Sequence, residues 1–111
     1  MSAKSEVYAA LTATGIPGRQ DAYPVGKSPT PPFFVYTVES TGGFVADGIV
    51  YACLPRFHVE LFEKVSNSET EALVRDAILS LGCVPDETGI WSESEVCHIE
   101  QFDFTYHNRQ E

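Results

Sequence analysis

Three histidines and three cysteines are the residues of this chain with the types needed for metal binding or nucleophilic chemistry. They are His58, His98, His107, Cys53, Cys83 and Cys97. Structural zinc sites usually take pairs of ligands two to four residues apart, and no two of these residues have that spacing. Cys97 and His98 are adjacent, so on a strand their side chains point to opposite faces. The spacing argues against a metal site, and Cys53 and Cys83 are interpreted as small core residues.

Paired carboxylates are the other candidates for catalysis. Glu93 and Glu95 lie beside Trp91 and are expected on one face of a strand. Two such groups can hydrolyse a glycosidic bond, but only in a cleft flanked by aromatic and amide side chains. Nothing near the cysteines indicates a stabilised thiolate, and the glycine pairs match no phosphate-binding motif. We expect neither catalysis nor a cofactor.

The length and charge of the chain limit its partners. Its 111 residues fit one domain, residues 1–111, and the net charge is −9. Seven scattered basic residues argue against a nucleic-acid-binding surface. Lysine and arginine are absent between Arg75 and Arg109, an interval that contains Asp86, Glu87, Glu93, Glu95, Glu100 and Asp103. One interpretation of this acidic segment is a solvated face that maintains solubility.

The cellular location is also constrained by composition. An odd number of cysteines without a CxxC pair fits thiols in a reducing cytosol. The N-terminus has no pattern of a secretion signal, and no apolar run approaches the ~20 residues that cross a bilayer. We expect a soluble protein made inside a cell, without membrane contact.

The elements that must position these residues follow from hydrophobic periodicity. Residues 3–14 and the segment from Ser68 to Leu81 have helical spacing, and Ser68–Glu71 is a capping box. The apolar stripe of the second helix consists of Leu73, Val74, Ala77, Ile78 and Leu81. Strands are expected at 33–40, 44–53 and 56–64, at 90–94 and at 95–106, with a short piece starting at Cys83. The order α-β-β-β-α-β-β predicts an α+β fold, a small antiparallel sheet with two helices packed on one face.

The last predicted strand changes its apolar phase. Cys97 and Ile99 occupy odd positions, whereas Phe102, Phe104 and Tyr106 occupy even ones. A bulge near Glu100-Gln101 would return all of them to one buried face.

Residues 15–32 are rich in proline and glycine, which predicts an extended loop long enough to reach a partner. Aromatic residues near turns and strand ends are expected to be partly exposed, as in protein–protein contacts. With the acid of the Asp-Gly turn, the hypothetical contact residues are Tyr23, Phe33, Phe44, Asp47 and Tyr51. The alternative is that these aromatics are ordinary cover for the core.

Four short sequence motifs follow one another along the chain in an order typical of a known family. They are Gly15-Ile16-Pro17 after an N-terminal helix, the segment 31–36, Phe44 to Tyr51 with Arg56 to Phe62, and Trp91 to Glu95 before a long strand. In this order and spacing the chain resembles the tail-completion, tail-terminator-like family of siphophages and prophages, which acts at the head-to-tail junction.

The resemblance implies a structural virion protein that caps the tail tube and joins it to the head and neck. It implies a ring, expected to be a hexamer, with the tail tube protein and the head-closure or neck protein as partners, assembled in the host bacterial cytoplasm. It implies no catalysis and no cofactor. DNA would pass through without specific binding, and because negative walls repel phosphate, Glu93 and Glu95 are expected to line the channel. The alternative is a small non-catalytic α+β protein-binding module.

Overall fold

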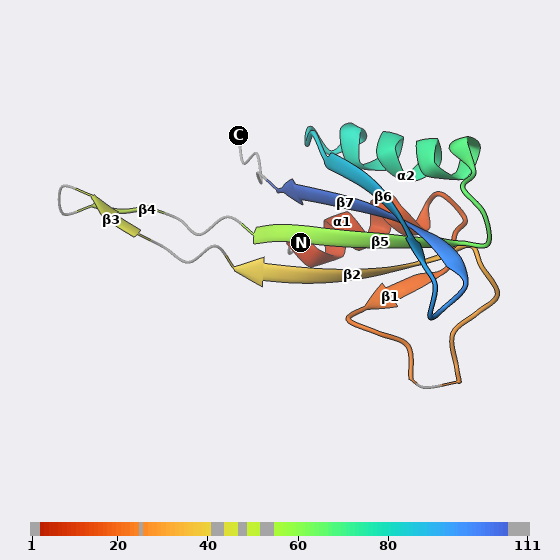
Figure 1. The fold of residues 1–111 in the computed structure, drawn as a ribbon. Coiled ribbons are helices and arrows are strands. Elements are labelled where there is room, and N and C mark those ends of the chain that lie inside the picture. Colours follow the sequence, from red (N-terminus) through yellow and green to blue (C-terminus); the bar gives the residue numbers. More distant parts are fainter. Residues whose placement is uncertain (1–2, 25, 41–43, 47–48, 52–54, 107–111) are drawn as a thin grey trace.

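A computed structural model describes residues 3–24, 26–40, 44–46, 49–51 and 55–106. The helices are α1 (Ala3–Thr12) and α2 (Ser68–Ser80), and the strands are β1 (Gly18–Gln20), β2 (Phe33–Ser40), β3 (Phe44–Ala46), β4 (Ile49–Tyr51), β5 (Pro55–Glu63), β6 (Asp86–Ser92) and β7 (Cys97–Thr105). Five strands form one sheet in the order β1-β2-β5-β7-β6. β3 pairs with β4 in a separate hairpin that lies beyond one end of this sheet (Figure 1). The predicted α+β class and the predicted order of elements are confirmed.

Both helices cover the same face of the sheet (Figure 1). Strand alternation sends every second side chain of β2, β5 and β7 to this helix-covered face. The core there contains Val7, Leu11, Phe34, Tyr36, Phe57, Val59, Leu61, Val74, Ile78, Phe102 and Phe104. The hydroxyl of Tyr106 donates a hydrogen bond to the Glu6 carboxylate, which ties α1 to the end of β7.

Strand β1 lies within the segment predicted to be an extended loop, and it pairs parallel to β2. The sheet is therefore mixed rather than wholly antiparallel. Gly18 is opposite Phe34 in the register, and a Cβ atom at Gly18 would come within 2.4 Å of the Phe34 ring. This close approach requires a glycine. Because glycine is not a typical strand residue, the sequence of β1 does not indicate a strand.

Helix α2 differs from its prediction at its start and on one flank. Asn67, not Ser68, caps the helix, because its Oδ1 accepts hydrogen bonds from the backbone N–H groups of Glu69 (2.9 Å) and Thr70 (3.1 Å). The Glu71 carboxylate accepts from the Asn67 N–H at 3.2 Å, so the reciprocal bond is also shifted by one residue. Leu73 is 49% exposed, since it lies on the flank of the stripe centred on Val74 and Ile78.

The predicted bulge in the last strand is wrong. β7 pairs without interruption with β5, from His98 opposite Glu63 to Thr105 opposite Arg56, and equally with β6. Cys97 and Ile99 therefore lie on the face opposite the helices, and both are buried. The phase change reflects a sheet that is apolar on both faces at this end, so no extra residue is needed to restore burial.

Candidate functional site

The face of the sheet opposite the helices, here called the open face, carries an aromatic cluster at one end. Phe33 and Phe62 are cross-strand neighbours whose rings stack at 4.8 Å, and Ile99 is the next residue in register. Tyr23 contacts Phe33 edge to face at 5.5 Å. Tyr23 reaches this position because β1 holds the preceding chain against β2, with the Asp21 N–H donating to the Tyr36 carbonyl at 2.8 Å.

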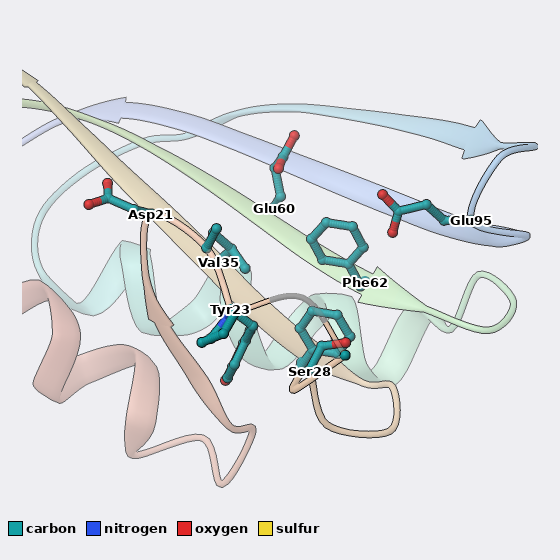
Figure 2. A pocket seen from close by; sticks show the side chains of 11 residues that line it. Asp21, Tyr23, Ser28, Val35, Glu60, Phe62 and Glu95 are labelled. Atoms are coloured by element: carbon teal, nitrogen blue, oxygen red, sulfur yellow. The ribbon is translucent and has the colours of Figure 1, made fainter.

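These rings border a pocket of about 500 Å³, here called the Tyr23 pocket (Figure 2). Its lining comprises Asp21, Ala22, Tyr23, Pro24, Gly26, Ser28, Phe33, Val35, Glu60, Phe62 and Glu95. Three carboxylates from three separate segments, those of Asp21, Glu60 and Glu95, surround an apolar floor formed by Val35 and Phe62 (Figure 2). Such a surface fits an apolar or aromatic side chain.

Tyr23 lines the pocket and also lies close to a positively charged side chain. The Arg19 guanidinium lies 5.7 Å from the centre of its ring, within range of a cation–π contact. Burial raises the pKa of the Tyr23 hydroxyl above its ordinary value near 10.

The structure brings together three of the residues singled out in the sequence. Tyr23, Phe33 and Glu95 all line the Tyr23 pocket. Phe33 is only 8% exposed, so the expectation that its side chain is partly exposed is wrong, because Tyr23 and Phe62 cover it. Its role as a contact residue stays a prediction.

The remaining expected contact residues belong to the hairpin. Phe44 and Tyr51 are cross-strand partners in β3 and β4. Asp47 lies outside the described residues.

Glu93 and Glu95 occupy the turn between β6 and β7 rather than one face of a strand. Ser92 and Cys97 are the last cross-strand pair of the two strands, so residues 93–96 form the turn. Val96 adopts a left-handed backbone conformation with φ of 52° in this turn. Both glutamates are exposed, as a role on a surface requires.

A second polar group lies farther along the open face. His58 Nδ1 is 2.7 Å from Asp103 Oδ1, and His58 Nε2 is 3.4 Å from Glu60 Oε2. Burial alone would lower the pKa of His58, but the hydrogen bonds and charges of Asp103 and Glu60 outweigh it, so the pKa is raised.

A third group, which the spacing of histidines and cysteines did not indicate, is buried on the helix-covered face. Glu63, Glu71, His98 and Glu100, here called the glutamate–histidine cluster, converge from β5, α2 and β7. Burial, with the neighbouring Glu71 and Glu100, raises the pKa of Glu63 to about 8. A sequence signal existed: Glu63 continues the alternation of Phe57, Val59 and Leu61, which places it on the buried side of β5.

The described helices include none that is both long and apolar enough to cross a membrane. A scan against protein-family models found no matching family, and a search of curated proteins found no similar sequence.

Proposed function

We propose that this protein is a structural subunit of a ring, with six subunits expected, that closes the end of a phage tail tube and joins it to the neck. In this proposal it performs no catalysis, its partners are copies of itself, the tail tube protein and the head-closure protein, and it is located in the virion. The proposal rests on the hairpin of β3 and β4, here called the arm.

The arm leaves the body of the protein at the ends of β2 and β5 (Figure 1). A single two-stranded hairpin is marginally stable in water unless something packs against it. The described residues of the arm are all apolar or aromatic by type, namely Phe44, Val45, Ala46, Ile49, Val50 and Tyr51. This composition favours a binding role for the arm, with a neighbouring protein supplying the contacts.

The Tyr23 pocket lies at the opposite end of β2 from the arm. Phe33, the first residue of β2, lines the pocket, whereas the arm follows Ser40, the last residue. Eight residues of strand separate the two features by roughly 25 Å. A protrusion at one end and an apolar recess at the other suit head-to-tail contacts, which close into a ring when the rotation between neighbours permits.

The net charge supports the same proposal. The exposed pair Glu93 and Glu95 would give the bore a negative wall, so DNA would pass without adhering. The Tyr23 pocket by itself also favours a second candidate, a non-catalytic module that binds an apolar side chain of another protein.

Removal of the arm tests the proposal. Ser40 and Pro55 are cross-strand partners, so residues 41–54 can be replaced by Asn-Gly, the residues of a two-residue hairpin turn. In a phage that depends on this protein, we expect the shortened protein to fold, measured by circular dichroism, but to leave tails uncapped in electron micrographs. Leu79→Ser, which removes an exposed apolar side chain from α2, is the control and should give capped tails.

The two candidates give different results. Normal capped tails with the armless protein would contradict the ring proposal. A protein that never joins tails but still binds a partner through the Tyr23 pocket, with loss of binding in Tyr23→Ala, would establish the binding module instead.

A further inference from the structure

The glutamate–histidine cluster concentrates acidic groups in a buried place. Glu63, Glu71 and Glu100 are 3%, 7% and 9% exposed. His98 Nε2 lies 2.8 Å from Glu100 Oε1 and 3.7 Å from Glu71 Oε2. Ligand atoms of Glu63, Glu71 and His98 all lie within 4.8 Å of one another.

The Glu63 carboxyl group makes no hydrogen bond of normal geometry with the described residues; the Asn67 backbone lies close enough to lower its pKa, but the Asn67 N–H donates to Glu71. Both carboxylate oxygens of Glu63 are buried and unpartnered, whereas Glu71 accepts hydrogen bonds from the Ser66 hydroxyl and the Asn67 N–H. A buried carboxylate is strongly disfavoured unless a cation or donors compensate it. The orphaned group points into the space shared with Glu71 and His98, so the missing partner belongs there.

The described lysines and arginines do not supply that partner. Arg75 is engaged with Glu87, at 2.7 Å, and no described lysine or arginine forms a salt bridge with Glu63, Glu71 or Glu100. One histidine can carry at most one positive charge, against three carboxylates. With all three carboxyl groups ionised, a further cation would balance the charge of the cluster, whereas without one Glu63 keeps a proton.

Gly89 of β6 leaves room for the side chains to converge. It is opposite Glu100 in the register, and a Cβ atom there would come within 2.6 Å of Glu100 Oε1 and 2.8 Å of His98 Cε1. A larger residue would displace both side chains from their present positions.

We propose that Glu63, Glu71 and His98 bind a divalent transition-metal ion, with Zn²⁺ the best fit, and that Glu100, which lies 2.8 Å from His98 Nε2, turns toward the ion to supply the fourth ligand. Donor atoms around tetrahedral zinc lie about 3–3.5 Å apart, and the distances of 2.8 Å and 3.7 Å from His98 Nε2 bracket that range. An imidazole nitrogen among carboxylates suits Zn²⁺ or Mn²⁺ better than Mg²⁺ or Ca²⁺, which prefer oxygen alone.

The ion has a structural role in this proposal. Its ligands come from β5, α2 and β7, and all are buried or nearly so, as in a closed site without an open coordination position. The ion would fasten the start of α2 to the sheet. This proposal does not depend on the proposed function.

Metal titration of the purified full chain tests the site. After treatment with a chelator, Zn²⁺ should bind with a stoichiometry of one in calorimetry. It should also raise Tm by roughly 10 °C when it exceeds its Kd about a hundredfold, whereas Mg²⁺ should not. Co²⁺ should bind with the visible absorption of a tetrahedral ion, a readout independent of stability.

Three variants and one control locate the ion. Glu63→Gln keeps the size of the side chain and removes the unpartnered charge, so the apoprotein should remain folded while Zn²⁺ affinity falls at least tenfold. His98→Gln and Gly89→Ala should weaken binding as well. His58→Gln, which removes the other carboxylate-paired histidine of the described residues, should bind as the wild type does.

Two results would overturn the proposal. One is the absence of Zn²⁺ and Co²⁺ binding by the wild type, and the other is equal binding by Glu63→Gln. With either result, Glu63 and Glu71 would instead share a proton.

Discussion

His58 and His98 are both paired with carboxylates, yet their surroundings give them different chemistry. His98 lies among buried glutamates on the helix-covered face, whereas His58 lies partly exposed on the open face beside Asp103 and Glu60. The partly exposed acidic partners of His58 favour its protonated form.

His58 should make folding stability depend on pH. Its pKa in the folded protein is raised above the ordinary value near 6.5, so its stabilising effect is complete below pH 6.5. The effect is lost as the pH rises through the raised pKa. We expect the free energy of unfolding of the wild type, relative to that of His58→Gln, to decrease with rising pH in denaturant titrations. The opposite slope, or parallel curves, would show that Asp103 and Glu60 do not hold the proton.

Ile78 and Leu73 form a matched pair for testing burial on α2. Ile78 is fully buried, so Ile78→Ala should lower the free energy of unfolding by about 2–5 kcal/mol. Leu73 is half exposed, so Leu73→Ala should cost less than about 1 kcal/mol. Chemical unfolding of both variants measures the difference, and equal losses would mean that Leu73 also packs in the core.

At the scale of the elements, the N-cap of α2 is Asn67, one residue before the Ser68 that the sequence motif predicts. Asn67→Ala should destabilise the protein by about 0.5–2 kcal/mol, because it removes the acceptor for two backbone N–H groups. Ser68→Ala changes a first-turn residue of the helix and should have a smaller effect. A larger loss for Ser68→Ala in thermal unfolding would restore Ser68 as the cap.

Strand β1 depends on the fit of one glycine against one ring. Gly18→Ala should lower the free energy of unfolding by about 1–3 kcal/mol, since the added methyl group would overlap the buried Phe34 ring. Arg19→Lys changes an exposed residue of the same strand, keeps a positive charge beside Tyr23 and serves as the control. Stability unchanged by Gly18→Ala would indicate that β1 can shift away from β2 without cost.

At the scale of the whole molecule, three features lie outside the hydrophobic core. They are the arm, the Tyr23 pocket and the acidic β6–β7 turn. The protein extends 50 Å in its longest dimension and 26 and 23 Å in the others, and the arm lies along the long direction (Figure 1). This shape places the features that could contact neighbours at the two ends.

The β6–β7 turn gives a test of the proposed channel. Glu93→Lys combined with Glu95→Lys should leave folding intact, because both residues are exposed in a turn. In assembled particles it should slow DNA ejection, and added salt should relieve the delay because screening weakens the attraction to phosphate. Since Glu95 also lines the Tyr23 pocket, Glu93→Lys alone, which leaves the pocket unchanged, should have an effect of the same kind. Asp76→Lys with Asp86→Lys makes the same charge change elsewhere and should eject DNA normally. Wild-type kinetics for the Glu93 and Glu95 variant would leave these acids as a solubility surface.

Helices and strands were predictable because their patterns arise within a few residues. The spacing of Val74 and Ile78 and the alternation along β5 depend only on local backbone geometry. The α+β class followed from the order of such patterns. The capping residue of α2 was missed by one position, since Asn67 and Ser68 are both good caps and only the folded backbone selects between them.

The features that escaped prediction all join distant parts of the chain. β1 forms because Gly18 can approach Phe34, and β7 changes its buried side because Phe33 and Phe62 make the open face apolar. Neither fact has a local signal.

The Tyr23 pocket and the glutamate–histidine cluster have the same origin. Alternation indicated that Glu63 faces the helices, but its proximity to Glu71 and His98 depends on strand register and on the packing of α2. Helices and strands can be predicted from local sequence patterns because short-range sterics determine them. Contacts between separate segments depend on burial and strand pairing across the whole fold.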